Sequence, residues 1–258
     1  MIKNTKFGTL YIVATPIGNL NDITARALEV LSSVDFCAAE NTRKSKVLFN
    51  NYQIKTKLVS YHKYSEDKKL DLLIKNLKQG KNIALISDAG TPLISDPGYL
   101  LVKEARKEFI DVIPIPGPSS ITSVISVSGF PLDSFTFYGF LSRQMKYRKQ
   151  TIKKISTDTK TSIVFESGKR IKSFLIDLKE ESPEIEIFIG REMTKLNETF
   201  YTGKIDKVLE KISFERYALK GEFVIVIKGN PSLSRERHIN LEQKRILSIL
   251  LESLEKKQ

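Results

Sequence analysis

The sequence lacks the features of secreted, membrane-spanning and zinc-binding proteins. Its 258 residues include one cysteine, Cys37, and two histidines, His62 and His238, which lie far apart in the chain. A single cysteine excludes an internal disulfide, and histidines without cysteine neighbours argue against a structural zinc site. No apolar run approaches the ~20 residues of a membrane span, and the N-terminal stretch has no apolar signal segment. These absences predict a cytoplasmic, globular protein that binds no metal.

Acidic residues are scarce relative to basic ones. The chain has 42 Lys and Arg against 30 Asp and Glu, a net charge of +12. Residues 41–57 carry five cations and residues 143–154 carry six, and neither stretch contains an acid. Such clusters favour a polyanionic partner, RNA or DNA, although a solvated face has the same composition. The predicted nucleic-acid-binding cations of these stretches are Arg43, Lys44, Lys46, Arg143, Lys146, Arg148 and Lys149.

The order of apolar patterns predicts an α/β fold. In the first half, strand patterns at 10–14, 83–86 and 112–115 alternate with helical patterns at 67–79 and 100–109. A further helix is predicted after Asp22, which we expect to cap it. This alternation predicts a mainly parallel sheet. The 41% of hydrophobic residues is enough for a sizeable core.

The second half has a different pattern of strands and helices, which predicts a second domain. Strand patterns at 135–140, 161–167, 184–192 and 222–229 are separated by two helical patterns. Such a mix favours a sheet that includes antiparallel pairs. We therefore predict an N-terminal α/β domain over 1–117, a C-terminal α/β domain over 118–232, and a helix or tail over 233–258. That last segment is expected to pack on the body or on a second subunit.

Three loops follow predicted parallel strands and are candidates for a ligand site, because ligands bind outside the carboxyl ends of such strands. They span residues 15–19, 87–98 and 116–120, and none is a P-loop or a G-x-G-x-x-G fingerprint. The middle loop, S-D-A-G-T-P-L-I-S-D-P-G, offers two aspartates, Asp88 and Asp96, and no Lys or Arg. That suits a ligand with an ammonium, a sulfonium or ribose hydroxyls better than a polyphosphate.

Three other interpretations of this loop remain open. One is the D-x-G-T motif of sugar-kinase and actin-type folds, which usually lies near the N-terminus. The aspartates could simply cap a turn and a helix. Alternatively, Asp88 to Thr91 resembles the phosphotransfer motif of haloacid-dehalogenase-type phosphatases, but Ala89 stands where that motif has its second aspartate.

Several motifs together resemble one protein family. They are T-P-I-G-N-L-N-D-I-T-A-R-A-L at 15–28, A-E-N-T-R at 39–43, S-D-A-G-T-P-L-I-S-D-P-G-Y at 87–99 and P-G-P-S-S at 116–120. F-E-S-G-K-R, R-E-M-T-K and K-G-E follow in the same order, at 165–170, 191–195 and 220–222. From Leu10 to Gly229 the chain resembles the tetrapyrrole methylase family, in particular its members that act on small-subunit ribosomal RNA.

The resemblance implies a cofactor, a reaction and an assembly. It implies two α/β domains with S-adenosylmethionine bound in a cleft between them, and a homodimer. The implied reaction is 2′-O-methylation of a cytidine ribose in the decoding region of small-subunit ribosomal RNA. The resemblance further implies a cytoplasmic protein whose partner is this RNA in the assembled small ribosomal subunit. Loops of backbone groups and aspartates suit the methionine end of this cofactor, which carries no phosphate.

The resemblance also implies roles for individual residues. The implied catalytic residues are Glu40, Arg43, Glu166 and Lys195, and Arg170 and Arg191 are implied to hold RNA phosphates. Two positions depart from the family pattern, since Asn41 replaces an aspartate and Lys169 replaces a histidine. The implied cofactor-binding residues are Pro16, Gly18, Asp88, Ala89, Gly90, Thr91, Pro92, Ser95, Asp96, Pro97, Gly98, Ser119, Ser120, Lys220, Gly221 and Glu222.

Two alternative functions stay open. One is a methylase acting on a tetrapyrrole precursor, against which the basic clusters and A-E-N-T-R argue. The other is an RNA-binding or ribosome-assembly module without catalysis, against which the intact T-P-I-G-N and S-D-A-G-T-P motifs argue.

Overall fold

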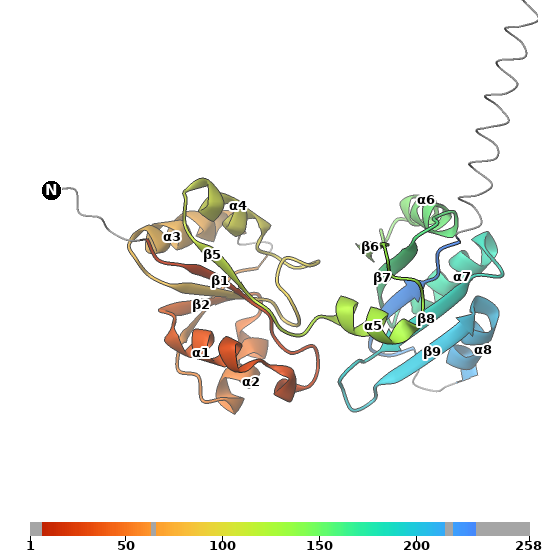
Figure 1. Cartoon of the computed structure of the whole chain (residues 1–258), viewed down its shortest axis with the longest axis horizontal. Coiled ribbons are helices and arrows are strands. Elements are labelled where there is room, and N and C mark those ends of the chain that lie inside the picture. The colour runs from red at the N-terminus through yellow and green to blue at the C-terminus, as the bar shows by residue number, and fades with distance from the viewer. Residues whose placement is uncertain (1–6, 63–65, 215–218, 231–258) are drawn as a thin grey trace, which may run out of the picture. The chain divides into compact units, whose positions relative to one another are not determined.

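The chain forms two compact units, shown in Figure 1. The computed structural model describes residues 7–62, 66–214 and 219–230. The first unit comprises Met1–Ser123 and Met193–Glu198, and the second comprises Val124–Glu192 and Thr199–Gln258. No helix in the described ranges is both long and apolar enough to cross a membrane.

The first unit is built on a five-stranded parallel sheet with the order β3-β2-β4-β1-β5. This confirms the predicted parallel sheet. The central strand β4 is buried along its whole length, as its unbroken apolar sequence requires. All five carboxyl ends lie at one edge of the sheet. The strands are β1 (Leu10–Val13), β2 (Phe36–Ala39), β3 (Lys57–Ser60), β4 (Ile83–Ile86) and β5 (Val112–Ile115).

Helices cover both faces of this sheet. Alternate residues of β4 point to opposite faces: Ala84 and Ile86 join the core under α1 and α2, whereas Ile83 and Leu85 join the core under α3 and α4. The elements are the 3₁₀ turn η1 (Leu20–Asp22), α1 (Ala25–Ser33), α2 (Thr42–Asn51), α3 (Glu66–Lys78) and α4 (Tyr99–Lys107).

The predicted cap of the first helix was wrong. Thr24, not Asp22, is the N-cap of α1, and its hydroxyl oxygen accepts a hydrogen bond from the Ala27 N–H at 3.2 Å. Asp22 instead ends η1, one short turn earlier. Both residue types cap helices well, so the sequence alone could not separate them.

The second unit has a mixed sheet with the order β6-β7-β10-β8-β9. Strands β6 and β7 are parallel and the other three pairs are antiparallel, which confirms the predicted mixed sheet. Helices α6, α7 and α8 pack their apolar sides into one core against it. The elements are β6 (Phe135–Phe140), α6 (Met145–Ser156), β7 (Thr161–Ser167), α7 (Ile171–Glu181), β8 (Glu186–Arg191), β9 (Thr199–Lys204), α8 (Ile205–Phe214) and β10 (Glu222–Ile227).

The division between the units differs from the expected boundary after residue 117. It falls after Ser123, inside α5 (Ser120–Ser128), and the short segment 193–198 belongs to the first unit although the chain around it belongs to the second. A boundary argued from proline content along the chain has no means of detecting such a discontinuous segment. The expected helix or tail over 233–258 lies outside the described residues.

Candidate functional site

The three candidate loops lie together at the carboxyl edge of the first sheet. The Thr15 N–H donates to the Gly90 carbonyl and the Gly90 N–H donates to the Thr15 carbonyl, both at 2.9 Å. On the other side of β1, a Cβ built on Gly117 would lie 3.1 Å from the Cβ of Ala14. The loop after β1 is therefore held between the loops after β4 and β5, where a parallel sheet binds ligands.

The loop after β4 has an unusually constrained backbone. Leu93 and Ser95 have φ angles of 74° and 67°, a region that side chains other than glycine rarely occupy. Gly98 has φ 131°, and a Cβ there would lie 2.7 Å from Cδ2 of Leu85. Backbone strain of this kind clusters at functional sites, where it fixes the geometry of ligand-binding groups. The loop thus presents its aspartates from a rigid frame.

Three carboxylates gather where β2 and β4 end. The Asp88 N–H donates to Oε2 of Glu40 at 3.3 Å, so Glu40 helps to hold the loop. Burial, more than any neighbouring charge, raises the pKa of the Glu40 carboxyl above its usual range. Burial, reinforced by the Glu40 charge, raises the pKa of Asp96 to about 6. Such grouping of carboxylates in a low-dielectric site favours a cationic ligand.

Asp88 has one oxygen paired and one without a partner. Lys44, at the first turn of α2, approaches Oδ2 of Asp88 at 2.8 Å, so a cation does reach this loop, although none lies within it. The other oxygen, Oδ1, is buried and has no hydrogen-bond partner among the described residues. A buried carboxylate oxygen without a donor is costly, and a ligand ammonium would satisfy it.

The departure at Asn41 leaves the local structure intact. Its side-chain oxygen caps α2 by accepting from the N–H groups of Arg43 and Lys44, at 3.1 and 3.4 Å. Asparagine and aspartate are about equally good N-caps, so this replacement preserves the helix start that carries Lys44.

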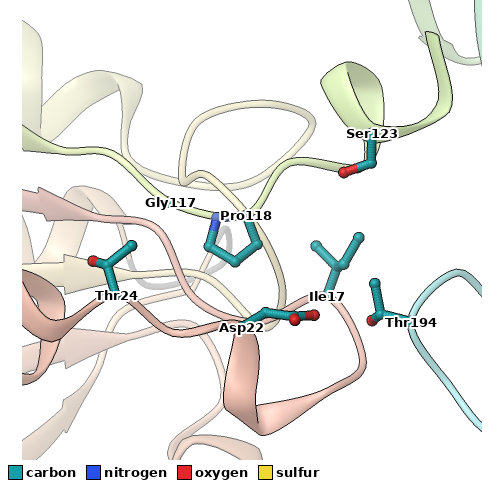
Figure 2. Close-up of a pocket in the computed structure, with 7 residues that line it drawn as sticks. All are labelled: Ile17, Asp22, Thr24, Gly117, Pro118, Ser123 and Thr194. Carbon is teal, nitrogen blue, oxygen red and sulfur yellow. The ribbon is translucent and has the colours of Figure 1, made fainter. Parts of the chain in front are cut away.

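A pocket of about 330 Å³ opens beside these loops within the first unit. This volume is at the lower end of the range of small-molecule sites. Figure 2 shows the Asp22 carboxylate extending from η1 toward Ile17 and Thr194. Sequence reasoning treated Asp22 only as a helix cap and did not consider Thr194. The lining residues are Ile17, Asp22, Thr24, Gly117, Pro118, Ser123 and Thr194.

The segment 193–198 brings a predicted catalytic residue to the loop after β1. The Asn19 N–H donates to the Thr194 hydroxyl oxygen at 3.0 Å. A Cβ on Gly18 would lie 2.5 Å from Cγ of Lys195 and 2.6 Å from Oγ1 of Thr194, so only glycine permits this approach. Lys195 and the predicted cofactor residue Gly18 are therefore neighbours.

In the second unit, Glu166 holds Arg170. Glu166 is buried, and its Oε1 accepts from the Arg170 Nε and from the Ser167 N–H, both at 2.7 Å. The Arg170 Nη1 also donates to the Leu141 carbonyl at 3.2 Å. A buried carboxylate engaged in this way positions an arginine, and the geometry does not favour direct proton exchange with a substrate.

The K-G-E motif joins the ends of two strands in the same unit. The Arg191 Nε donates to the Lys220 carbonyl at 2.8 Å, and the Gly168 N–H donates to the Gly221 carbonyl at 2.9 Å. The Glu222 N–H donates to Oε1 of Glu192 at 2.9 Å. Lys220, Gly221 and Glu222 therefore organise the loops after β7 and β8.

Of the nine predicted RNA-binding cations, six are exposed, Arg170 is half-buried beside Glu166, and two are buried. Arg148 is only 9% exposed, and its guanidinium pairs with Asp177 of α7 at 2.5 Å. Arg191 is likewise buried, in the network around Lys220. We correct the predicted RNA-binding set by leaving both out, since a buried guanidinium committed to the fold is not available to a phosphate. The exposed members are Arg43, Lys44, Lys46, Arg143, Lys146 and Lys149.

The family model for Tetrapyrrole (Corrin/Porphyrin) Methylases matches residues 9–209, most of the chain. The chain belongs to the tetrapyrrole methylase family. Family members named Ribosomal RNA small subunit methyltransferase I are close in sequence. The one from Thermotoga maritima is 45% identical over 222 residues, covering 86% of this chain and 99% of its own. The one from Haemophilus influenzae is 42% identical over 248 residues, covering 96% and 88%.

Solved structures support the tetrapyrrole methylase fold. A uroporphyrin-III-C-methyltransferase from Thermus thermophilus has a TM-score of 0.59 at 18% identity, over 89% of this chain and 98% of its own. A diphthine synthase has a TM-score of 0.66 at 16% identity, over 86% and 90%. At such identities these neighbours establish the shared fold, and they carry no information about the substrate.

Proposed function

We propose that this protein transfers a methyl group from S-adenosylmethionine to the ribose 2′-hydroxyl of a cytidine in the decoding region of small-subunit ribosomal RNA. The observation that carries the proposal is the rigid, carboxylate-lined loop edge of the first unit, which suits a cationic ligand without phosphates. The relatives with 42–45% identity, named for ribosomal RNA of the small subunit, supply the class of acceptor.

The polar groups of these loops fit S-adenosylmethionine. The buried Oδ1 of Asp88 lacks a donor, and the cofactor's ammonium would provide one. The Thr15–Gly90 bridge holds the loops after β1 and β4 together, and backbone groups of these loops can bind the cofactor's remaining polar groups. When bound, the cofactor supplies an electrophilic methyl group on a sulfonium.

The chain's own contribution is mainly orientation and proton handling. Holding donor and acceptor in line can account for ~7–11 kcal/mol of the barrier. The Asp22 carboxylate extends into the pocket, and we assign it to accept the hydrogen bond, and then the proton, of the acceptor hydroxyl. Lys195 lies beside the loop after β1, where its ammonium would attract a phosphate of the bound RNA.

This assignment predicts a specific effect of Asp22→Asn. Because the amide cannot take a proton, the rate of methyl transfer at saturating cofactor should fall about 10²–10⁴-fold. Cofactor affinity, measured by calorimetry, should stay near that of the unmodified protein. A variant that keeps its full rate would remove Asp22 from this role, and Asp35→Asn, at the opposite end of the sheet, is a control for a general charge effect.

The proposed function is tested with labelled S-adenosylmethionine and three acceptors: purified small ribosomal subunits, naked small-subunit ribosomal RNA, and a tetrapyrrole precursor. We expect label in the RNA, and the comparison of the first two acceptors identifies the form of substrate. Label in the tetrapyrrole alone would establish the small-molecule methylase instead. Cofactor binding without transfer to any acceptor, or no cofactor binding, would contradict the proposal and favour an assembly module.

Assembly and location follow from the same proposal. We expect a cytoplasmic homodimer, as the family resemblance implies, and its mass in solution can be measured by light scattering.

A further inference from the structure

The second unit carries exposed aromatic rings among cations at the carboxyl end of β6. Phe140, the last residue of β6, is 57% exposed, and Tyr147 in the first turns of α6 is 54% exposed. Arg143 and Lys146 are exposed between them, and Lys169 is exposed after β7. We call these five residues the aromatic–cationic surface. Large exposed rings with flanking charges mark interaction sites more often than isolated surface residues do.

The fold holds this surface together. Strands β6 and β7 are parallel neighbours, so the loops that follow them emerge at the same edge of the sheet. Arg170 ties the two loops by donating from Nη1 to the Leu141 carbonyl at 3.2 Å. Arg170 is itself fixed by the buried Glu166. The surface is therefore preorganised rather than assembled on binding.

Phe140 lies on a supported aromatic layer. A register shift between Phe137 and Gly139 keeps Phe137 and Phe140 both against Phe165, with ring centroids 4.9 and 5.5 Å away. β-Bulges of this kind aim side chains, often near binding sites. Phe140 thus stands on Phe165 with more than half of its surface exposed, which leaves a ring face for a further aromatic partner.

The charge around these rings indicates the chemistry of the partner. From Ser134 to Thr157 the sequence contains no Asp or Glu. Two copies of this surface facing one another would bring like charges together, which disfavours a second copy of the chain as occupant. A polyanion with exposed aromatic faces satisfies both features, and single-stranded nucleic acid has this composition.

We infer that the aromatic–cationic surface binds a single-stranded RNA segment, with bases stacked on Phe140 and Tyr147 and phosphates held by Arg143, Lys146 and Lys169. The inference rests on the proposed function for its choice of RNA. It adds an RNA-binding surface carried wholly by the second unit, separate from the loops that hold the cofactor. Sequence-tolerant stacking of this kind serves RNA whose bases are unpaired.

The test measures binding of a fluorescent oligouridylate of about 12 nucleotides by anisotropy, without methyl donor. Tyr147→Ala should weaken binding roughly 5- to 150-fold, the loss expected for one stacked base, and Phe140→Leu should weaken it toward the lower end of that range. Tyr147→Phe retains the ring and should bind like the unmodified protein. Phe214→Leu is the matched control, because Phe214 is 83% exposed on α8, which packs at the β9 edge of the same sheet.

Each outcome decides the inference. Weakened binding in both ring-removing variants, with unchanged thermal unfolding and cofactor affinity, supports it. Unchanged oligouridylate affinity in both overturns it. Unchanged affinity with a shift from dimer to monomer in light scattering overturns it too and makes the surface an interface between copies. This experiment measures RNA binding and not methyl transfer. Its result can therefore be interpreted even if the proposed function is wrong.

Discussion

Glu40, Asp88 and Asp96 are three carboxylates at one edge, and their surroundings give them different roles. Glu40 accepts a backbone hydrogen bond from the loop, Asp88 pairs with Lys44, and burial raises the pKa of Asp96 to about 6. Of these three carboxylates, only Asp88 keeps a buried oxygen without a hydrogen-bond partner among the described residues. We therefore regard Asp88 as the ligand-binding member and the other two as its support.

Asp88→Ala should abolish most of the cofactor affinity while leaving the fold intact. Loss of one hydrogen bond to a charged group is worth ~1.5–3 kcal/mol, about 10- to 150-fold in Kd. Calorimetry with S-adenosylmethionine measures the effect, and circular dichroism checks the fold. The matched control is Asp71→Ala on the exposed side of α3. A folded Asp88→Ala protein with unchanged affinity would contradict the assignment.

Asp96 predicts a pH dependence of both stability and binding. Its pKa is raised to about 6 in the folded protein, so its ionisation opposes folding. The protonated Asp96 carboxyl contributes its full stabilisation of the folded protein below the ordinary pKa of aspartate. This contribution to the free energy of unfolding is lost as the pH rises through about 6. Asp96→Asn should therefore increase the free energy of unfolding more at pH ~7 than at pH ~4.

Binding should show the opposite trend. An ionised Asp96 attracts the cationic cofactor, so affinity should rise as the pH passes about 6, and Asp96→Asn should flatten that rise. Urea unfolding and calorimetry across this range measure the two effects. Identical pH profiles for the variant and the unmodified protein would show that Asp96 does not titrate there.

At the scale of elements, the loop after β4 is the part whose geometry matters most. Gly98→Ala adds a methyl group 2.7 Å from Leu85 at a φ of 131°, and should destabilise the protein by about 2–4 kcal/mol and weaken cofactor binding. Gly203→Ala is a matched control, because Gly203 has φ 129° and open space around its Cβ position. Gly203→Ala reports backbone strain alone, whereas Gly98→Ala reports strain plus steric overlap, so urea denaturation of both variants separates the two effects. Equal losses in the free energy of unfolding would show that the overlap is relieved at no cost.

Elements with strong apolar runs were predictable from the sequence, and short ones were not. The run at 83–86 is β4 as expected, and Gly80, with φ 86°, follows the end of α3. By contrast, β2 is only F-C-A-A and β3 is K-L-V-S, and four residues of such composition carry no clear periodicity. Their place in the sheet is set by pairing with β4 and with each other.

The candidate site was predictable where a single loop carries it and not where distant segments meet. The motif at 87–98 pointed directly to Asp88 and Asp96. Nothing local indicated that Thr194 and Lys195 would lie beside Gly18, because that proximity joins positions about 175 residues apart in the chain. The buried state of Arg148 was equally hidden, since its partner Asp177 lies on another helix.

At the scale of the whole molecule, the net charge of +12 predicts salt-sensitive RNA binding. Each phosphate contact to single-stranded RNA contributes a slope of about −0.7 to the logarithm of the binding constant against the logarithm of salt concentration. Neutralising two exposed cations, as in Arg143→Gln with Lys146→Gln, should reduce the slope by about 1.4. Arg106→Gln with Lys107→Gln, at the end of α4, is the charge-matched control. A flat salt dependence would exclude the basic clusters as the RNA footprint.

The position that receives the methyl group distinguishes the proposed function from its alternatives most directly. The decisive measurement is to methylate purified small ribosomal subunits with labelled S-adenosylmethionine, digest the RNA to nucleosides, and locate the label by mass spectrometry and by mapping on the RNA. We expect one labelled cytidine in the decoding region, with the methyl group on the ribose 2′-oxygen. A methyl group on a base, or label spread over many nucleotides, would contradict the proposed function.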